Sequence, residues 1–152
     1  MSEEARRATA EDLPAIVDLY RAATAELRQE RGGEMWAVTT GRDGEPDLRL
    51  DDDDGLLVLA GTFAGTVVGY ARVEQHDLPD GSGLAVLTDV YVEPAAREVG
   101  IGEALLDAAI AWARERQCRG MDSIALPGMR DTKNFFEAAG LVARAITVHR
   151  SL

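Results

Sequence analysis

The stretch VYVEPAAREVGIGEALL, residues 90–106, decides the fold of this chain. It has the pattern of a strand end, then a loop with the spacing Arg97-x-x-Gly100-x-Gly102, then a helix start. Glycines let successive backbone N–H groups turn into one concavity without a Cβ in the way. These N–H groups belong to a helix N-terminus, where four donors lack intrahelical partners and the helix dipole favours negative charge. The loop therefore predicts a cradle for a phosphate group.

Two other phosphate-binding loops do not match this spacing. A dinucleotide-binding fingerprint needs a third glycine where the chain has Leu105, and a P-loop needs Gly-Lys-Ser/Thr, which the sequence does not contain. A glycine turn that merely ends a strand is the simpler alternative, and a lone Gly-x-Gly would favour it. Here the strand, the arginine, the glycine spacing and the amphipathic helix that follows all agree on the cradle.

Outward from this loop, the chain alternates between extended and helical patterns. Apolar residues recur at three- and four-residue steps from Leu13 to Leu27, which predicts one helix face. Branched residues and tight turns predict three antiparallel strands in succession, 56–61, 66–74 and 84–92. We also expect strands at 6–8, 123–126 and 141–149, and helices at 34–40, about 102–117 and 132–139. The predicted fold class is α/β (α+β): one domain, residues 1–152, with a mixed, mostly antiparallel sheet and helices on both faces.

Composition sets limits on the kinds of partner. The chain has 152 residues, a formal net charge of −11 and a sequence pI near 4.6, which disfavours nucleic acid and acidic membrane surfaces. A single cysteine, Cys118, cannot form an internal disulfide, and two histidines give no dense cluster, so we expect no metal site. No apolar run approaches the roughly 20 residues of a spanning helix. We expect a cytoplasmic protein with no membrane partner.

The charge is unevenly distributed along the chain. Residues 1–92 carry eight arginines and nineteen acidic residues, whereas residues 93–152 are neutral. Seven of the acidic residues lie between Asp43 and Asp54. A charged run of this kind is most simply a solvated loop, and the alternative is a negative field that concentrates a cationic substrate. Trp36, close to these acids in sequence, either binds a cation or simply covers the sheet.

At the strand-to-helix junction, the sequence resembles the GNAT superfamily of acyl-CoA-dependent N-acetyltransferases, whose signature is Arg/Gln-x-x-Gly-x-Gly/Ala. Residues 7–14, 90–94 and 134–141 extend the resemblance over nearly the whole chain. The resemblance implies that Arg97 stands at the loop entrance and that the following backbone binds the pyrophosphate of coenzyme A. The residues of that backbone are Glu98, Val99, Gly100, Ile101, Gly102 and Glu103.

The same resemblance implies a path for the rest of the coenzyme. The main chain of Val90, Tyr91 and Val92 would pair with the pantetheine arm as though the arm were an added strand. This pairing requires the strand 84–92 to splay from its neighbour, expected at 123–126, and leaves a wedge for the thioester. Asn134 and Phe136 would flank the arm.

The implied reaction transfers an acetyl group from acetyl-CoA to a primary amine of a cationic small molecule or a protein, by direct attack in a ternary complex. A lysine-like amine with a pKa of about 10.4 is neutral only about once in 10³ at pH 7, so a base must help. Asp89, inside the predicted strand, is the first candidate, and Glu93 stands at the end of that strand. Glu74 and His76 are alternatives, and each of these groups could instead be a solvated or ion-paired surface residue.

Many relatives carry a tyrosine on the short helix, which protonates the departing thiolate, and this chain has Phe136 there. A thiol of pKa about 8.5 is a tolerable leaving group without protonation. Tyr91 could substitute only if its side chain faces the wedge. The alternative function is a module of the same fold that holds or senses coenzyme A with little or no catalysis. The unpaired outer edge of the expected strand 141–149 favours a homodimer.

Overall fold

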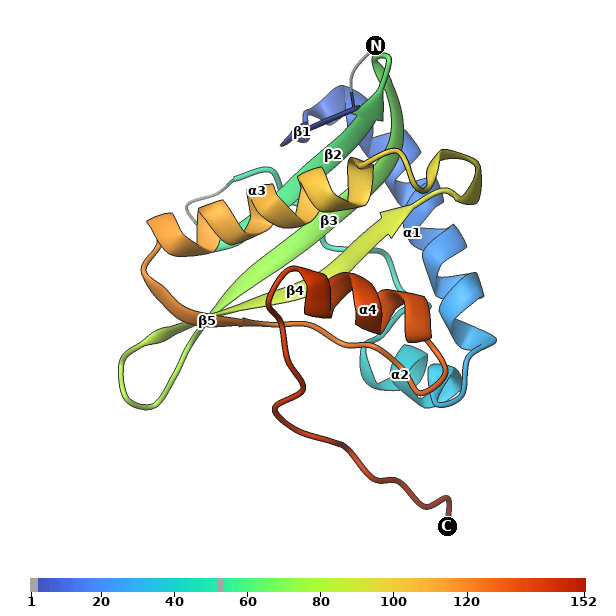
Figure 1. Ribbon diagram of the computed structural model, residues 1–152, viewed down its shortest axis with the longest axis vertical. Coiled ribbons are helices and arrows are strands. Elements are labelled where there is room, and N and C mark those ends of the chain that lie inside the picture. Colours follow the sequence, from blue (N-terminus) through green and yellow to red (C-terminus); the bar gives the residue numbers. More distant parts are fainter. Residues whose placement is uncertain (1–2, 52–53) are drawn as a thin grey trace.

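One sheet of five strands, in the order β1-β2-β3-β4-β5, forms the centre of the computed structural model, which describes residues 3–51 and 54–152 (Figure 1). Neighbouring strands are antiparallel except β5, which is parallel to β4. This arrangement confirms the mixed, mostly antiparallel sheet. Asp52 and Asp53 of the acidic run lie outside the described residues. The strands are β1 (Glu3–Arg7), β2 (Leu56–Phe63), β3 (Thr66–Asp77), β4 (Gly83–Val92) and β5 (Cys118–Asp122).

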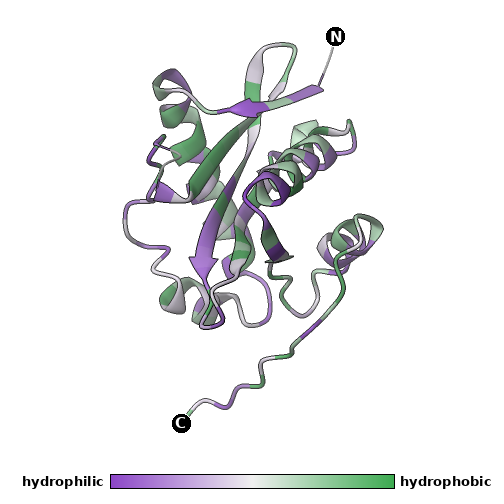
Figure 2. Ribbon diagram, turned by 90° about the vertical axis from the view of Figure 1, so that its left-hand side faces the viewer, coloured by the Kyte–Doolittle hydropathy of each residue, from purple (hydrophilic) through white to green (hydrophobic). Residues whose placement is uncertain are grey.

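Helices cover both faces of the sheet, as predicted. Figures 1 and 2 show α1 on one face and α3 and α4 on the other. Among the described residues, no helix is long and apolar enough to cross a membrane. The α-helices are α1 (Leu13–Arg28), α2 (Gly33–Thr39), α3 (Ile101–Glu115) and α4 (Arg130–Ala138), and the 3-10 turns are η1 (Ala10–Asp12) and η3 (Pro94–Ala96).

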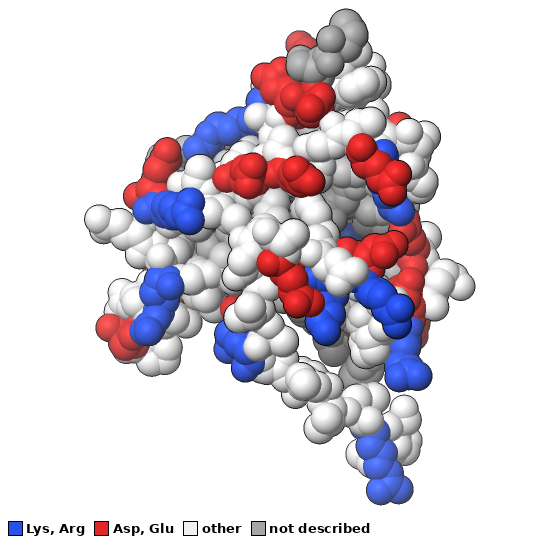
Figure 3. All heavy atoms as spheres, in the orientation of Figure 1, with Lys and Arg blue, Asp and Glu red and all other residues white. Residues whose placement is uncertain are grey.

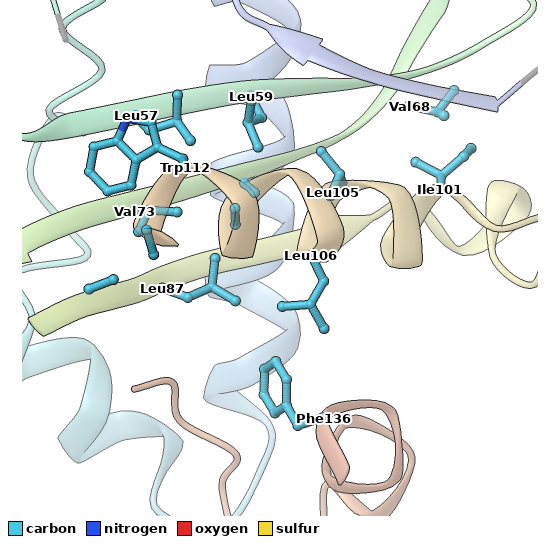
Figure 4. Close-up of a cluster of buried hydrophobic side chains, with 14 residues drawn as sticks. Leu57, Leu59, Val68, Val73, Leu87, Ile101, Leu105, Leu106, Trp112 and Phe136 are labelled. Carbon is cyan, nitrogen blue, oxygen red and sulfur yellow. The ribbon is translucent and has the colours of Figure 1, made fainter. Parts of the chain in front are cut away.

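Each face of the sheet has its own apolar core. On the α3 face, Leu105, Leu106 and Trp112 pack against buried strand residues such as Leu57 and Leu87 (Figure 4). On the α1 face, a second cluster forms around Ile16, Tyr20, Tyr70 and Tyr91. Burial of a large apolar side chain contributes about 1.5–3 kcal/mol of stability, so both clusters hold their helices to the sheet.

A bulge in β4 decides which side chains reach which face. Arg72 of β3 lies opposite Asp89 and Val73 lies opposite Leu87, so Thr88 is an extra residue in β4. An extra residue shifts the alternation of side chains by one position. Leu87 therefore packs in the α3-side core, whereas Tyr91, an even number of residues later, packs in the α1-side core.

The fifth strand differs from the prediction. We expected it at 123–126, but β5 spans Cys118–Asp122, because α3 ends at Glu115 and a left-handed Gln117 (φ 59°) reverses the chain at once. The pairing of β5 with β4 runs only from Gly83–Cys118 to Val86–Asp122. The two strands therefore splay beyond Val86, as the family resemblance implied.

The predicted strand 141–149 is wrong. Residues 141–152 form no strand and leave the sheet as an extended tail (Figure 1). Val142, Ile146 and Val148 are exposed, and Arg144 reaches back to pair with Asp122. The branched residues of this tail favour extended backbone, but a strand also needs a partner strand, and none of the described strands pairs with the tail.

Candidate active site

The glycine loop between η3 and α3 presents a row of free backbone donors. In the part of the chain that the structure describes, no acceptor bonds the N–H groups of residues 98–103. The N–H of Ala104 is the first of this run that is bonded, to the carbonyl of Gly100 at 3.0 Å. The donors stand at the N-terminus of α3, where the helix dipole favours negative charge. The loop can therefore bind an anion such as a diphosphate.

Of the two glycines of the loop, Gly100 is needed for its shape, whereas Gly102 is in close but ordinary contact with its neighbours. Gly100 has φ +89°, a left-handed conformation that L side chains rarely adopt. A Cβ on Gly102 would lie 3.4 Å from the ring of Phe135, so α4 packs closely over the start of α3. Phe135 therefore lies nearer the cradle than Phe136, a feature that the sequence did not reveal.

Arg97 is bound by its own chain rather than left free at the loop entrance. Its Nε donates to the carbonyl of Val92 at 2.8 Å, and its Nη2 donates to Glu26 of α1 at 3.0 Å. Glu26 also accepts the hydroxyl of Tyr91 at 2.9 Å. Burial alone would raise the pKa of Glu26, but the hydrogen bonds from Arg97 and Tyr91 lower it overall. Glu26 was missed because nothing in its local sequence links it to a residue 71 positions away.

One edge of β4 lies open beside this loop. On one side, Val90, Tyr91 and Val92 pair with β3, and on the other the partner strand β5 ends opposite Val86. Just after β5, Ser123 donates its hydroxyl to the carbonyl of Leu87 at 2.9 Å. The expected pantetheine-pairing residues therefore border the splayed end of the sheet.

The two predicted residues of α4 lie in different environments. Phe136 is 7% exposed and points into the α3-side core towards Leu106 (Figure 4). Asn134 is exposed and lines an open cleft of about 700 Å³ formed with residues 125–130 and 133. Of the pair, only Asn134 has its side chain at an open surface.

Asp89 lies on the α1 face, buried and already engaged. Its Oδ2 accepts a hydrogen bond from Arg42 Nη1 at 2.7 Å and another from the hydroxyl of Tyr70. The side chains of Arg42 and Asp89 are 6% and 4% exposed. Burial, together with the nearby carboxylate, raises the pKa of Tyr70 well above its usual value. Trp36 does bind a cation, but this cation is Arg42 of the same chain, 4.8 Å from the ring.

The other candidate bases are spread over the two ends of the sheet. Glu93 directly follows β4 and is half-buried. Tyr91 faces α1, where it bonds Glu26, and so points away from the α3 face. Glu74 and His76 lie at the far end of β3, within 3.7 Å of each other. The structure therefore brings Tyr91 and Glu93 close to the glycine loop, and leaves Glu74 and His76 apart from it.

Much of the acidic segment is neutralised by arginines. Asp43 pairs with Arg28 at 2.8 Å, and Asp47 and Asp54 both pair with Arg49. Acidic and basic side chains are interspersed on the face shown in Figure 3. Within the described ranges, no group of three or more His, Cys, Asp or Glu could hold a metal ion.

Comparison with known proteins places this chain in a family. The model of the acetyltransferase (GNAT) family matches residues 14–141. An aminoglycoside N(6')-acetyltransferase type 1 from Stenotrophomonas maltophilia is 38% identical over 114 residues, which cover 72% of this chain and 74% of that protein. The protein of the same name from Salmonella typhimurium is 28% identical over 102 residues, which cover 64% of this chain and 68% of that protein.

Solved structures share the fold. Glucosamine-6-phosphate N-acetyltransferase from Arabidopsis thaliana superposes with a TM-score of 0.70 at 13% identity, over 99% of both chains. Ribosomal-protein-alanine N-acetyltransferase from Brucella melitensis superposes with a TM-score of 0.69 at 18% identity, over 99% of this chain and 100% of that one. The chain belongs to the acetyltransferase (GNAT) family and is an acetyl-CoA-dependent N-acetyltransferase.

Proposed function

We propose that residues 1–152 act as one domain that transfers the acetyl group of acetyl-CoA to a primary amine of a cationic small molecule or a protein. The amine attacks directly, within a complex that holds both substrates. One observation carries this proposal: the free N–H groups of residues 98–103 stand next to the edge of β4 that β5 leaves unpaired beyond Val86.

In this proposal, the loop and the strand divide the work of holding the coenzyme. The N–H groups of residues 98–103 bind the diphosphate, with support from the helix dipole of α3. The open backbone of Val90, Tyr91 and Val92 pairs with the amide groups of the pantetheine arm, in the way that an added strand pairs with a sheet edge. Asn134 borders the arm from α4.

The chemistry is one substitution at the thioester carbonyl. The lone pair of the amine forms the C–N bond, the C–S bond breaks, and coenzyme A departs as a thiolate. The amine nitrogen gives up a proton to a base. We propose Asp89 first and Glu93 second as this base, and their surroundings differ. Tyr91 is the candidate acid for the departing thiolate, and its hydroxyl is bonded to Glu26 on the α1 side. Oδ2 of Asp89 already accepts two hydrogen bonds, so only its Oδ1 is left for a proton.

Acceptors that carry amino groups fit the α1 side of the molecule. A pocket of about 250 Å³ opens there between α1 and residues 42–45, and its walls carry both acidic and basic side chains, among them Arg28, Asp43 and Glu45. The curated relatives are named for aminoglycosides, which are small molecules with several amino groups. These names support a small polyamine acceptor over a protein amine.

An amine panel tests the reaction. Aminoglycosides, linear polyamines and lysine-containing peptides are each mixed with acetyl-CoA, and free thiol is measured. Release above the amine-free rate is the expected result. Calorimetry with acetyl-CoA alone separates the alternative, a coenzyme-binding module without turnover: tight binding with no thiol release for any amine would favour that module and overturn the enzyme.

The role of Asp89 has its own test. Asp89→Asn should lower the rate most at neutral pH, and Glu93→Gln is the matched change at the other proposed base. An unaltered pH profile in Asp89→Asn would reject Asp89 as the base and move the role to Glu93.

We further propose that the enzyme is cytoplasmic and works as a homodimer. The one cysteine, Cys118, is a free thiol, which suits a reducing compartment. The outer edge of β5 pairs with no described strand, and such an edge can pair with a second copy. Light scattering after gel filtration tests the dimer, and a monomer mass would contradict it.

A further inference from the structure

Arg42 reaches from the loop after α2 into the space between α1 and the sheet. Its guanidinium lies 3.7 Å from the centre of the Tyr20 ring and 4.8 Å from that of Trp36. Nη1 donates to Asp89 at 2.7 Å, and Nε donates to the hydroxyl of Thr24 at 3.0 Å. The residue is 8% exposed, although arginine is rarely buried.

The residues around Arg42 come from four elements and together provide the contacts that bind a guanidinium group. We call them the Arg42 cage. The rings supply two faces for a planar cation, the carboxylate supplies the opposite charge, and the hydroxyl supplies an acceptor. The Tyr70 hydroxyl bonds the same carboxylate oxygen and so holds it in place. The cage consists of Tyr20 and Thr24 from α1, Trp36 from α2, Tyr70 from β3 and Asp89 from β4.

We propose that the Arg42 cage is a guanidinium-binding site whose resident ligand is Arg42 of the same chain, and that Arg42 is thereby a positioning residue for the acceptor side of the enzyme. The proposal rests on the proposed function only where it names the α1 face as the acceptor side. A cationic group of the acceptor cannot lie against the rings of Tyr20 and Trp36, or bond Oδ2 of Asp89, while Arg42 fills that space.

The contacts of the next residue show how Arg42 can position the pocket. Asp43 makes two hydrogen bonds of 2.8 Å to Arg28 of α1. Arg28, Arg42 and Asp43 all line the 250 Å³ pocket. Because Arg42 fixes one end of this loop inside the core, it also fixes the wall of the pocket that Asp43 forms. Loss of Arg42 should therefore disturb acceptor binding and leave the glycine loop intact.

Chemical rescue tests the cage. Arg42→Ala should have a lower melting temperature than the wild type, and millimolar guanidinium should raise that temperature more than the same concentration of sodium chloride does.

The kinetics give a second test of the Arg42→Ala variant. Its KM for the acceptor should rise about tenfold or more, since small displacements of positioning groups have large effects. Acetyl-CoA affinity by calorimetry should be unchanged, and guanidinium should lower the raised KM. A purely structural arginine would give neither the selective KM effect nor its rescue.

Arg6→Ala is the matched control. Arg6 also pairs with a buried carboxylate, Asp12, at 2.6 Å, but no aromatic ring lies over its guanidinium among the described contacts. Guanidinium should raise the melting temperature of this variant no more than sodium chloride does. Equal rescue of Arg6→Ala and Arg42→Ala would show a general salt effect and overturn the cage.

Two further variants keep the test decisive if Arg42→Ala does not fold. Arg42→Lys retains the charge but not the planar fork, and should raise the acceptor KM without changing acetyl-CoA affinity. Trp36→Leu removes one ring of the cage and should also raise the acceptor KM without changing acetyl-CoA affinity. Acceptor KM values equal to the wild type in both variants would overturn the proposal. If the wild type turns over no amine, the proposed function fails instead, and guanidinium-dependent melting of Arg42→Ala still decides whether the cage exists.

Discussion

Arg97 Nε donates a hydrogen bond to the carbonyl oxygen of Val92 over 2.8 Å, which ties the glycine loop to the last residue of β4. The same guanidinium bonds Glu26 of α1, and Glu26 accepts the hydroxyl of Tyr91. One side chain therefore holds together the loop that offers free N–H groups, the strand edge beside it and the helix on the other face.

Arg97→Ala should weaken acetyl-CoA binding about tenfold. A hydrogen bond that involves a charged group contributes about 1.5–3 kcal/mol, and 1.4 kcal/mol corresponds to a tenfold change in affinity. Titration calorimetry measures the effect. Arg114→Ala, an exposed change in the last turn of α3, is the control and should leave the affinity unchanged. Equal affinities for the two variants would mean that Arg97 does not shape the loop.

Gly100→Ala should weaken acetyl-CoA binding at least tenfold. An alanine at φ +89° is strained, which disfavours this loop conformation, and its Cβ would lie 3.3 Å from the carboxylate of Glu3, which must move aside. Gly65→Ala is a close match for the strain, since Gly65 has φ +82° but nothing within 4 Å of an added Cβ. Both variants should lose about 1–2 kcal/mol of stability, and only Gly100→Ala should lose affinity. A normal affinity in Gly100→Ala would remove the cradle from the proposed site.

Phe136→Tyr should lower stability by about 1–3 kcal/mol and leave kcat unchanged. The ring is 7% exposed in the apolar core beneath α3, so an added hydroxyl would be buried without a partner. Urea unfolding and steady-state kinetics measure the two effects. Phe135→Tyr, at a half-buried position, should be tolerated better. An increase of kcat in Phe136→Tyr would show that the hydroxyl does reach the departing thiolate.

Stability should fall in acid partly through Asp12. The hydrogen bond from Arg6 lowers the pKa of Asp12 from 3.8 to about 2, against the effect of burial. A lowered folded-state pKa stabilises the protein above pH 4, and this stabilisation disappears as the pH falls from about 4 to about 2. Because Arg6 is more than one-third exposed, we expect only about 1–2 kcal/mol after screening. Urea unfolding over this pH range should show a shallower slope in Arg6→Gln, and an equal slope would contradict the assignment.

Local patterns predicted what depends on neighbours in sequence. The three- and four-residue steps from Leu13 predicted α1, and the glycine spacing after β4 predicted a loop with free donors. The same kind of pattern failed for residues 141–149, because a strand needs a partner that branched residues alone do not provide. Periodicity reports the preference of a segment and not the presence of its neighbour.

The side-chain partners of the site could not be read from the sequence. Arg42 and Asp89 are 47 residues apart, and Glu26 and Arg97 are 71 apart. An arginine in a glycine-rich acidic loop has the pattern of a surface residue, and only the packing of α1 and α2 on the sheet makes a buried place for it. Asp89 was expected to be near the reacting amine for its type and position, and the ion pair with Arg42 became visible only in three dimensions.

Thr88 is an extra residue in β4, so the alternation of side chains changes there. Odd-numbered residues face α3 up to Leu87 and face α1 from Asp89 onward. Point substitutions at Thr88 would keep this change of phase, since it arises from residue count and not from side-chain chemistry. Deletion of Thr88 would remove the bulge and place Asp89 directly after Leu87, on the opposite face of the sheet, so Asp89 and Tyr91 would still face α1 and Val90 and Val92 would still face the α3 side. The orientation of the later half of β4 should therefore survive both the exchange and the removal of Thr88.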